Sequence, residues 1–175
     1  MPRFITLPDF DGMFSDLAHS AWRLESRRRY ASDEATDTYR QFAAGLPVTW
    51  DLTDPWCTER REQVALGKRF ERVRILDDPP TEGQLYLLDN ARRNRAAGED
   101  IRTLTRARAS ALQLPDEDFW IFDARVVALL HFTADDDLTH VELITHPGAV
   151  LRYCQAREAA WHHATAAWPT RPLTP

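Results

Sequence analysis

In the middle of the chain, the spacing of apolar side chains switches between the period of a strand and that of a helix. Residues 69–76, RFERVRIL, alternate apolar and charged positions, which predicts a strand with Val73 and Ile75 on one face. Residues 81–98 have helical spacing between a capping threonine and a glycine, and residues 99–104, EDIRTL, form a second strand pattern. Because a right-handed helical crossover joins parallel strands, this order predicts a β-α-β unit.

The pattern continues with strands and closes with a helix. FWIFD at residues 119–123 and RVVALLHF at residues 125–132 indicate two strands joined by a tight turn, and HVELIT at residues 140–145 indicates another. The DDD run at residues 135–137 is typical of a hairpin turn. A long helix is predicted from Pro147, because proline is favoured in a first helical turn.

The first third of the chain is less regular. It is predicted to hold a helix, a strand and a second helix, at residues 10–17, 20–30 and 34–45. Ser32 or Asp33 could cap the second helix. Residues 46–60 carry no sustained period, so they are predicted to form a loop, with a short helix near residues 55–64.

These elements predict an α/β fold, with α+β as the alternative. A length of 175 residues suits one domain, and 43% apolar with 28% charged residues is ordinary for a globular protein. We therefore expect a single domain over residues 1–168, in which a mixed sheet with the β-α-β unit at its core is flanked by helices. The Pro-rich residues 169–175 are expected to form a disordered tail.

Charge and cysteine content exclude several classes of protein. A net charge of −5 and a pI near 5.7 count against a protein that coats nucleic acid, because such binding needs basic residues over a broad surface. Cys57 and Cys154 lie far apart without a CxxC pair, so neither a zinc site nor a disulfide framework is indicated. With no leader-like or membrane-length apolar segment, we expect a cytoplasmic protein without a cofactor or membrane.

Five arginines form the first candidate site: Arg72, Arg74, Arg102, Arg106 and Arg108. Alternation places Arg72 and Arg74 on one face of their strand, and pairing with the next strand could bring Arg102 beside them. One interpretation is an anion pocket, because the guanidinium fork suits phosphate and carboxylate. The other is ion pairing, which buried arginines require, with acidic residues such as Glu25, Glu71, Glu99, Asp118 or Asp123.

An acidic group is the alternative site: Asp116, Glu117, Asp118 and Asp123. Several carboxylates could hold Mg²⁺ through oxygen ligands, whereas the segment around Pro115 also suits a turn before a strand. We expect no resident metal.

Aromatic side chains supply two further candidates. His131 and His140 could meet across the last hairpin as an acid-base pair, although no serine or cysteine is placed near them, and ordinary packed histidines are the alternative. Trp50 and Trp56 lie in the irregular segment, where they could form a stacking site, an apolar ligand site or a surface for a protein partner.

Four segments carry a resemblance that covers roughly residues 10–161: SAWRLESRRRY, GKRFERVRIL, AAGEDIRTL and DFWIFDARVV. Together they resemble an uncharacterised family of small actinobacterial proteins that are frequently encoded near helix-turn-helix regulators. The resemblance implies a regulatory neighbourhood, with such a regulator as a candidate partner, and no specific activity.

The strand-helix-strand order and the closing strand with its aspartate resemble one half of the phospholipase D superfamily. Its motif is His, any residue, Lys, four residues, Asp, in which the His is the phosphoryl nucleophile and the Lys clamps phosphate. If Asp123 is aligned with the motif Asp, Asp116 takes the His position and Asp118 the Lys position. A carboxylate offers no imidazole nucleophile and repels phosphate, so the resemblance implies this fold without its catalysis.

The first functional hypothesis is therefore a non-catalytic regulatory or interaction protein that binds a partner protein or a small anionic ligand. The competing hypothesis is a phosphate-ester hydrolase that uses the acidic residues with a metal, or His131 with His140. Direct DNA binding ranks third, because the chain is acidic and lacks a helix-turn-helix pattern. A homodimer through a sheet edge or aromatic surface is also expected.

Overall fold

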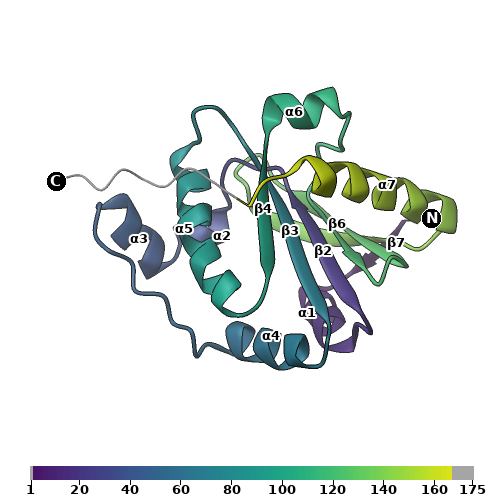
Figure 1. Cartoon of the computed structure of the whole chain (residues 1–175), viewed down its shortest axis with the longest axis horizontal. Helices are drawn as coiled ribbons and strands as arrows, with labels where there is room; N and C mark the ends of the chain where they lie inside the picture. The colour runs from purple at the N-terminus through teal and green to yellow at the C-terminus, as the bar shows by residue number, and fades with distance from the viewer. Residues whose placement is uncertain (1, 167–175) are drawn as a thin grey trace.

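A mixed sheet of seven strands forms the centre of the computed structural model, which describes residues 2–166 (Figure 1). The strands are β1 (Arg3–Ile5), β2 (Ser20–Glu25), β3 (Arg69–Leu76), β4 (Asp100–Thr105), β5 (Phe119–Phe122), β6 (Val126–Phe132) and β7 (Leu138–Ile144). They lie in the order β1-β7-β6-β5-β2-β3-β4. β2, β3 and β4 are parallel and the other pairs are antiparallel. The predicted α/β class and the β-α-β unit are confirmed.

Helices cover both faces of this sheet. They are α1 (Leu7–Asp16), α2 (Ala31–Glu34), α3 (Asp37–Ala43), α4 (Pro55–Ala65), α5 (Glu82–Ala96), α6 (Arg106–Ala111) and α7 (Pro147–His163). One apolar cluster joins α6 and α7 to the sheet, and a second joins α1 and α4 to its opposite face. We call these the α7 face and the α1 face. In Figure 1, α7 and α5 lie toward opposite sides of the molecule.

Alternation along β2 and β3 distributes their side chains between the two faces. Trp22 and Leu24 pack on the α7 face with Val73 and Ile75, as the period of two predicts. Both faces of β2 are buried. Every residue of β2 except Arg23 is buried, because a strand between two neighbours with helices on both sides has no solvent-facing side.

Local signals place most helix ends correctly. The Thr81 hydroxyl accepts the backbone N–H of Gln84, whose side chain accepts the N–H of Thr81 in return, so α5 begins with a capping box. Gly98 follows α5 with a φ of +98°, which glycine adopts at low cost. The helix predicted over residues 34–45 is instead α3, which begins only at Asp37 because Thr36 caps it, and a separate short helix, α2, ends at Glu34.

The β3–β4 register corrects the expected position of Arg102. Val73 pairs with Arg102, so Arg102 lies on the α7 face, opposite Arg72 and Arg74. Its guanidinium carbon lies 3.8 Å from the centroid of the Trp161 ring, at a distance that allows a cation–π contact. A register offset of one residue is enough to move a side chain to the other face.

The remaining predictions concern the turns and the tail. The turn at Asp123 and Ala124 joins β5 to β6 with positive φ angles at both residues, and the acidic turn at residues 135–137 joins β6 to β7. The predicted disordered tail at residues 169–175 lies outside the described residues. Within residues 2–166, no helix combines the length and apolar character needed to cross a membrane.

Candidate functional site

β2 and β3 build a network of buried charges on the α1 face of the sheet. Arg23 pairs with Arg72 in the strand register, and the next pair on this face is Glu25 with Arg74. The Glu25 carboxylate lies 3.0 Å from Nη1 of Arg23 and 3.2 Å from Nη1 of Arg72. It also accepts a short hydrogen bond from Nε of Arg74. One carboxylate therefore holds three guanidinium groups together.

Two further carboxylates complete the pairing of these arginines. Oε2 of Glu99 lies 2.6 Å from Nε of Arg72, and Oδ2 of Asp118 lies 3.4 Å from Nη2 of Arg23. In the part of the chain that the structure describes, three arginines thus face three carboxylates. An anion pocket needs unpaired positive charge, so the geometry favours the alternative interpretation, in which the arginines are structural ion pairs.

The protonation of this network follows from burial and proximity. Burial penalises ionised Glu25, but attraction by Arg74, Arg23 and Arg72 outweighs that penalty and holds the pKa of Glu25 well below its ordinary value. Burial also opposes the charge of Arg23, whereas Glu25 raises its pKa above the ordinary value. These groups are therefore charged at neutral pH and depend on one another.

Asp118 precedes β5 and is 2% exposed. Its Oδ1 accepts the backbone N–H of Ser26 at 2.7 Å and the hydroxyl of Ser26 at 2.8 Å. Its Oδ2 accepts a short hydrogen bond from the Tyr30 hydroxyl. Burial and the charge of Asp118 raise the pKa of Tyr30 well above its ordinary value. The Asp118 carboxylate is thus a hydrogen-bond acceptor inside the fold.

Asp123, another of the acidic candidates, lies apart from Asp118. Asp123 follows β5 at its far end, roughly 16 Å away along the strand at about 3.3 Å per residue. Its carboxylate accepts three backbone N–H groups at 2.6 to 2.9 Å, those of Ala18, His19 and Ser20. Burial opposes ionisation, but these bonds hold the pKa of Asp123 below its ordinary value. Within residues 2–166, no three His, Cys, Asp or Glu side chains are grouped to hold a metal.

The other arginine and tryptophan candidates also have partners. Nε of Arg106 lies 2.6 Å from Oδ1 of Asp77. The indole N–H of Trp50 donates to a carboxylate of α5 at 3.0 Å, and that of Trp56 donates to Glu99 at 3.0 Å. Neither indole N–H is left for a ligand, and the structure does not bring Trp50 and Trp56 to the same wall as Arg106.

His131 and His140 meet across the β6–β7 hairpin. The register pairs them, and their rings stack with centroids 4.4 Å apart. Nε2 of His131 lies 3.0 Å from Glu142, and the Thr139 hydroxyl contacts Nδ1 of His140 at 2.9 Å. No serine or cysteine of the described residues makes a hydrogen bond to either ring, and the Thr139 hydroxyl already donates to the backbone carbonyl of His131 at 2.9 Å.

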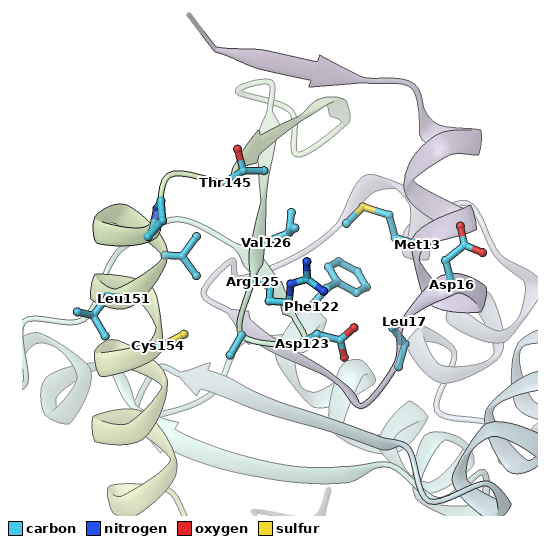
Figure 2. A pocket seen from close by; sticks show the side chains of 13 residues that line it. Met13, Asp16, Leu17, Phe122, Asp123, Arg125, Val126, Thr145, Leu151 and Cys154 are labelled. Carbon is cyan, nitrogen blue, oxygen red and sulfur yellow. The ribbon is translucent and has the colours of Figure 1, made fainter.

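A large groove lies where the two helical layers meet beside the β5–β6 turn (Figure 2). It has a volume of about 950 Å³ and separates α1 from α7. The walls are mainly apolar, with side chains from both helices that include Met13, Leu17, Leu151 and Cys154. Asp16 on the α1 side and Arg125 in the turn carry opposite charges, and neither makes an ion pair within the described residues.

Two residues of the charge network were not predicted as site residues. Glu25 was expected only as a pairing partner and Arg23 was not singled out, although the alternation of SAWRLE contains both. The signal that could have found them is their position on a strand that must be internal, because a charged side chain there has to be paired. No periodic pattern marks the groove, since its walls come from three separate segments of the chain.

Comparisons with known proteins describe the family and the fold. A family described as "Domain of unknown function (DUF6879)" matches residues 8–168. No curated protein matches the chain. Among solved structures, NucT from Helicobacter pylori is similar with a TM-score of 0.52 and 10% identity, over 94% of this chain and 97% of that chain. At this identity the likeness shows the fold alone, which is phospholipase D-like as predicted.

Proposed function

The chain belongs to the DUF6879 family of domains of unknown function, and from that premise and the geometry of its sites we propose that it is a non-catalytic regulatory protein that acts by binding a protein partner. One observation carries the non-catalytic part: Asp118 is engaged by Ser26, Tyr30 and Arg23 inside the fold. If Asp123 is aligned with the aspartate of the phospholipase D motif, Asp116 takes the position of the nucleophile and Asp118 that of the phosphate clamp.

The alternative is a phosphate-ester hydrolase, and the geometry supports it less. Asp118 and Asp123 lie at opposite ends of β5, so they do not converge on one reacting atom. His131 and His140 lie on a different part of the sheet, with Glu142 and Thr139 as their hydrogen-bond partners. The hydroxyls beside these groups are engaged in the fold. That of Ser26 beside Asp118 is buried, and that of Thr139 beside His140 donates to the carbonyl of His131.

A phosphodiesterase assay tests the non-catalytic part. Hydrolysis of bis(p-nitrophenyl) phosphate by the purified chain, with and without Mg²⁺, should stay at the rate without protein. The proposal would be contradicted by turnover that Asp118→Asn abolishes while the thermal melting curve stays unchanged, because that pattern separates catalysis from folding.

The groove between α1 and α7 is the surface that we propose for the partner. It is apolar, and Leu151 on its wall is 58% exposed, as expected for a surface that another protein covers. The charges of Asp16 and Arg125 would be complemented by an amphipathic helix with one basic and one acidic side chain beside its apolar face. The resemblance to proteins encoded near helix-turn-helix regulators makes such a regulator the proposed partner.

Titration calorimetry tests this partner. The purified chain is titrated with the purified helix-turn-helix regulator encoded nearest to it. Leu151→Asp should weaken binding at least tenfold, because it places a charge on the apolar wall. Leu66→Asp is the matched control, since Leu66 is 78% exposed and lies outside the groove. Equal affinities for the two variants, or no binding by the unmodified chain, would contradict the proposed surface.

A further inference from the structure

A cavity of about 210 Å³ lies over the buried charge network, on the α1 face of the sheet. Its walls include the aromatic rings of Phe10, Trp120 and Phe132 and polar side chains from β3, α2 and α5. A water molecule occupies roughly 30 Å³ in the liquid, so the cavity holds several waters or one small organic molecule. Drug-sized ligands need larger pockets, of roughly 300 Å³ or more.

Polar side chains on the cavity wall, among them Asn94, Arg74 and Asp33, keep hydrogen-bonding capacity that residues 2–166 do not satisfy. Asn94 is 4% exposed, yet its carboxamide makes no hydrogen bond there. Arg74 donates from Nε to Glu25 and from Nη1 to a carbonyl of α5, which leaves Nη2 without a partner. The carboxylate of Asp33 accepts no hydrogen bond. Asn94 and Arg74 are buried and Asp33 is partly exposed, so the cavity wall offers unpaired donors and acceptors that a polar occupant could satisfy.

The charges around the cavity favour a zwitterion, which carries one positive and one negative group, over an anion. The three arginines of the network are already balanced by Glu25, Glu99 and Asp118. Asp33 adds one more negative charge on the wall, and burial and then Glu25 raise its pKa above the ordinary value. A phosphate would therefore meet two carboxylates of the wall, whereas a positively charged group would give Asp33 the partner it lacks.

We propose that this cavity binds a small zwitterion of the size of an α-amino acid. Its carboxylate accepts a hydrogen bond from Nη2 of Arg74, its ammonium group donates to Asp33, and the Asn94 carboxamide bonds to either group. Its apolar part packs against the aromatic rings. This site goes beyond the proposed function and does not depend on a protein partner, and it would give a regulatory protein a metabolite to sense.

Calorimetry with the unmodified full chain tests the ligand chemistry. The twenty α-amino acids are titrated one by one at neutral pH, with inorganic phosphate as the anionic probe. At least one amino acid should bind saturably, and its carboxamide and N-acetyl derivatives should bind at least tenfold more weakly, because each removes one charge. The proposal is overturned if no amino acid binds, if both derivatives bind as well as the parent, or if phosphate binds more tightly.

Variants place the binding in the cavity. Asp33→Asn should weaken binding of the selected amino acid at least tenfold, because the neutral amide no longer pairs with an ammonium group. Asp135→Asn, an exposed position in the β6–β7 turn, is the control and should leave binding unchanged. Unaltered affinity in a folded Asp33→Asn protein overturns the site. If Asp33→Asn does not fold, the two derivatives decide the question on the unmodified chain.

Discussion

At the scale of single residues, Glu25 decides whether the charged layer of the core can exist. It is 3% exposed and lies within ion-pair distance of three arginines that two adjacent strands bring together. Buried guanidinium groups cannot shed their charge, so the loss of a shared carboxylate leaves uncompensated positive charge inside the protein. Glu99 and Asp118 each form an ion pair with only one of the arginines, so they cannot replace Glu25.

Glu25→Gln should therefore destabilise the protein by about 3–5 kcal/mol, the cost of removing one partner from a buried ion pair. Urea denaturation followed by circular dichroism measures the difference in the free energy of unfolding. Glu62→Gln is the control, because Glu62 is exposed on α4. A loss below about 1 kcal/mol in Glu25→Gln would mean that the network is held mainly by other contacts.

Residue types alone reveal part of the candidate site. The sequence identifies Arg72 and Arg74 as neighbours on one face of a strand, because alternation is a local property. It does not decide between an anion pocket and ion pairs, because the carboxylates that answer this question come from β2, the end of α5 and the start of β5. The roles of Asp33 and Asn94 are likewise set by contacts between distant segments.

At the scale of elements, α5 is joined to the parallel part of the sheet through its first turn. The side chain of Gln84 is 1% exposed and accepts the N–H groups of Thr81 and Asp77. It also donates to the carbonyl of Ile75 at 3.3 Å, so one residue links the start of α5 to the end of β3. The capping box is thus part of a larger contact between helix and strand.

Thr81→Ala should cost about 1 kcal/mol, as is usual for the loss of a helix cap. Gln84→Ala should cost more, because it also leaves buried backbone groups of β3 without partners. The double variant should lose less than the sum of the two, since both remove the same capping box. Urea denaturation of the three variants measures this, with Ser110→Ala in α6 as control. Strictly additive losses would contradict the coupling.

Most elements could be predicted from the sequence, because their apolar spacing and end signals are local. β3, α5, β4 and the β5–β6 turn were predicted from such signals alone. The face of Arg102 could not be predicted in this way, because the β3–β4 register depends on how α5 packs and not on either strand's own pattern.

At the scale of the whole molecule, carboxylate pKa values tie stability to pH. The pKa values of Glu25, Asp54, Asp77 and Asp123 lie below their ordinary values. In each case burial opposes ionisation, and hydrogen bonds or nearby arginines outweigh it. The pKa of Asp33 is raised instead, so its contribution has the opposite sign.

Carboxylates with lowered folded-state pKa values stabilise the protein above the unfolded-state pKa, near 4, and lose that contribution as pH falls through the folded-state value. The free energy of unfolding should thus be nearly constant from pH 7 to about 5 and decrease below about pH 4. Urea denaturation at several pH values measures it, and Asp54→Asn should reduce the slope. A free energy of unfolding that increases as the pH is lowered from 5 to 3 would show that the contribution of Asp33 outweighs that of the other four groups.

The contacts of Asp118 also limit which side chains this position could accept in evolution. A lysine at this position would place an ammonium group beside Arg23 and leave the Ser26 N–H and the Tyr30 hydroxyl without an acceptor. A single mutation toward the motif would therefore be selected against through folding before it gave any catalytic advantage. The contacts of Asp118 with Ser26, Tyr30 and Arg23 therefore oppose this substitution unless the neighbouring residues change as well.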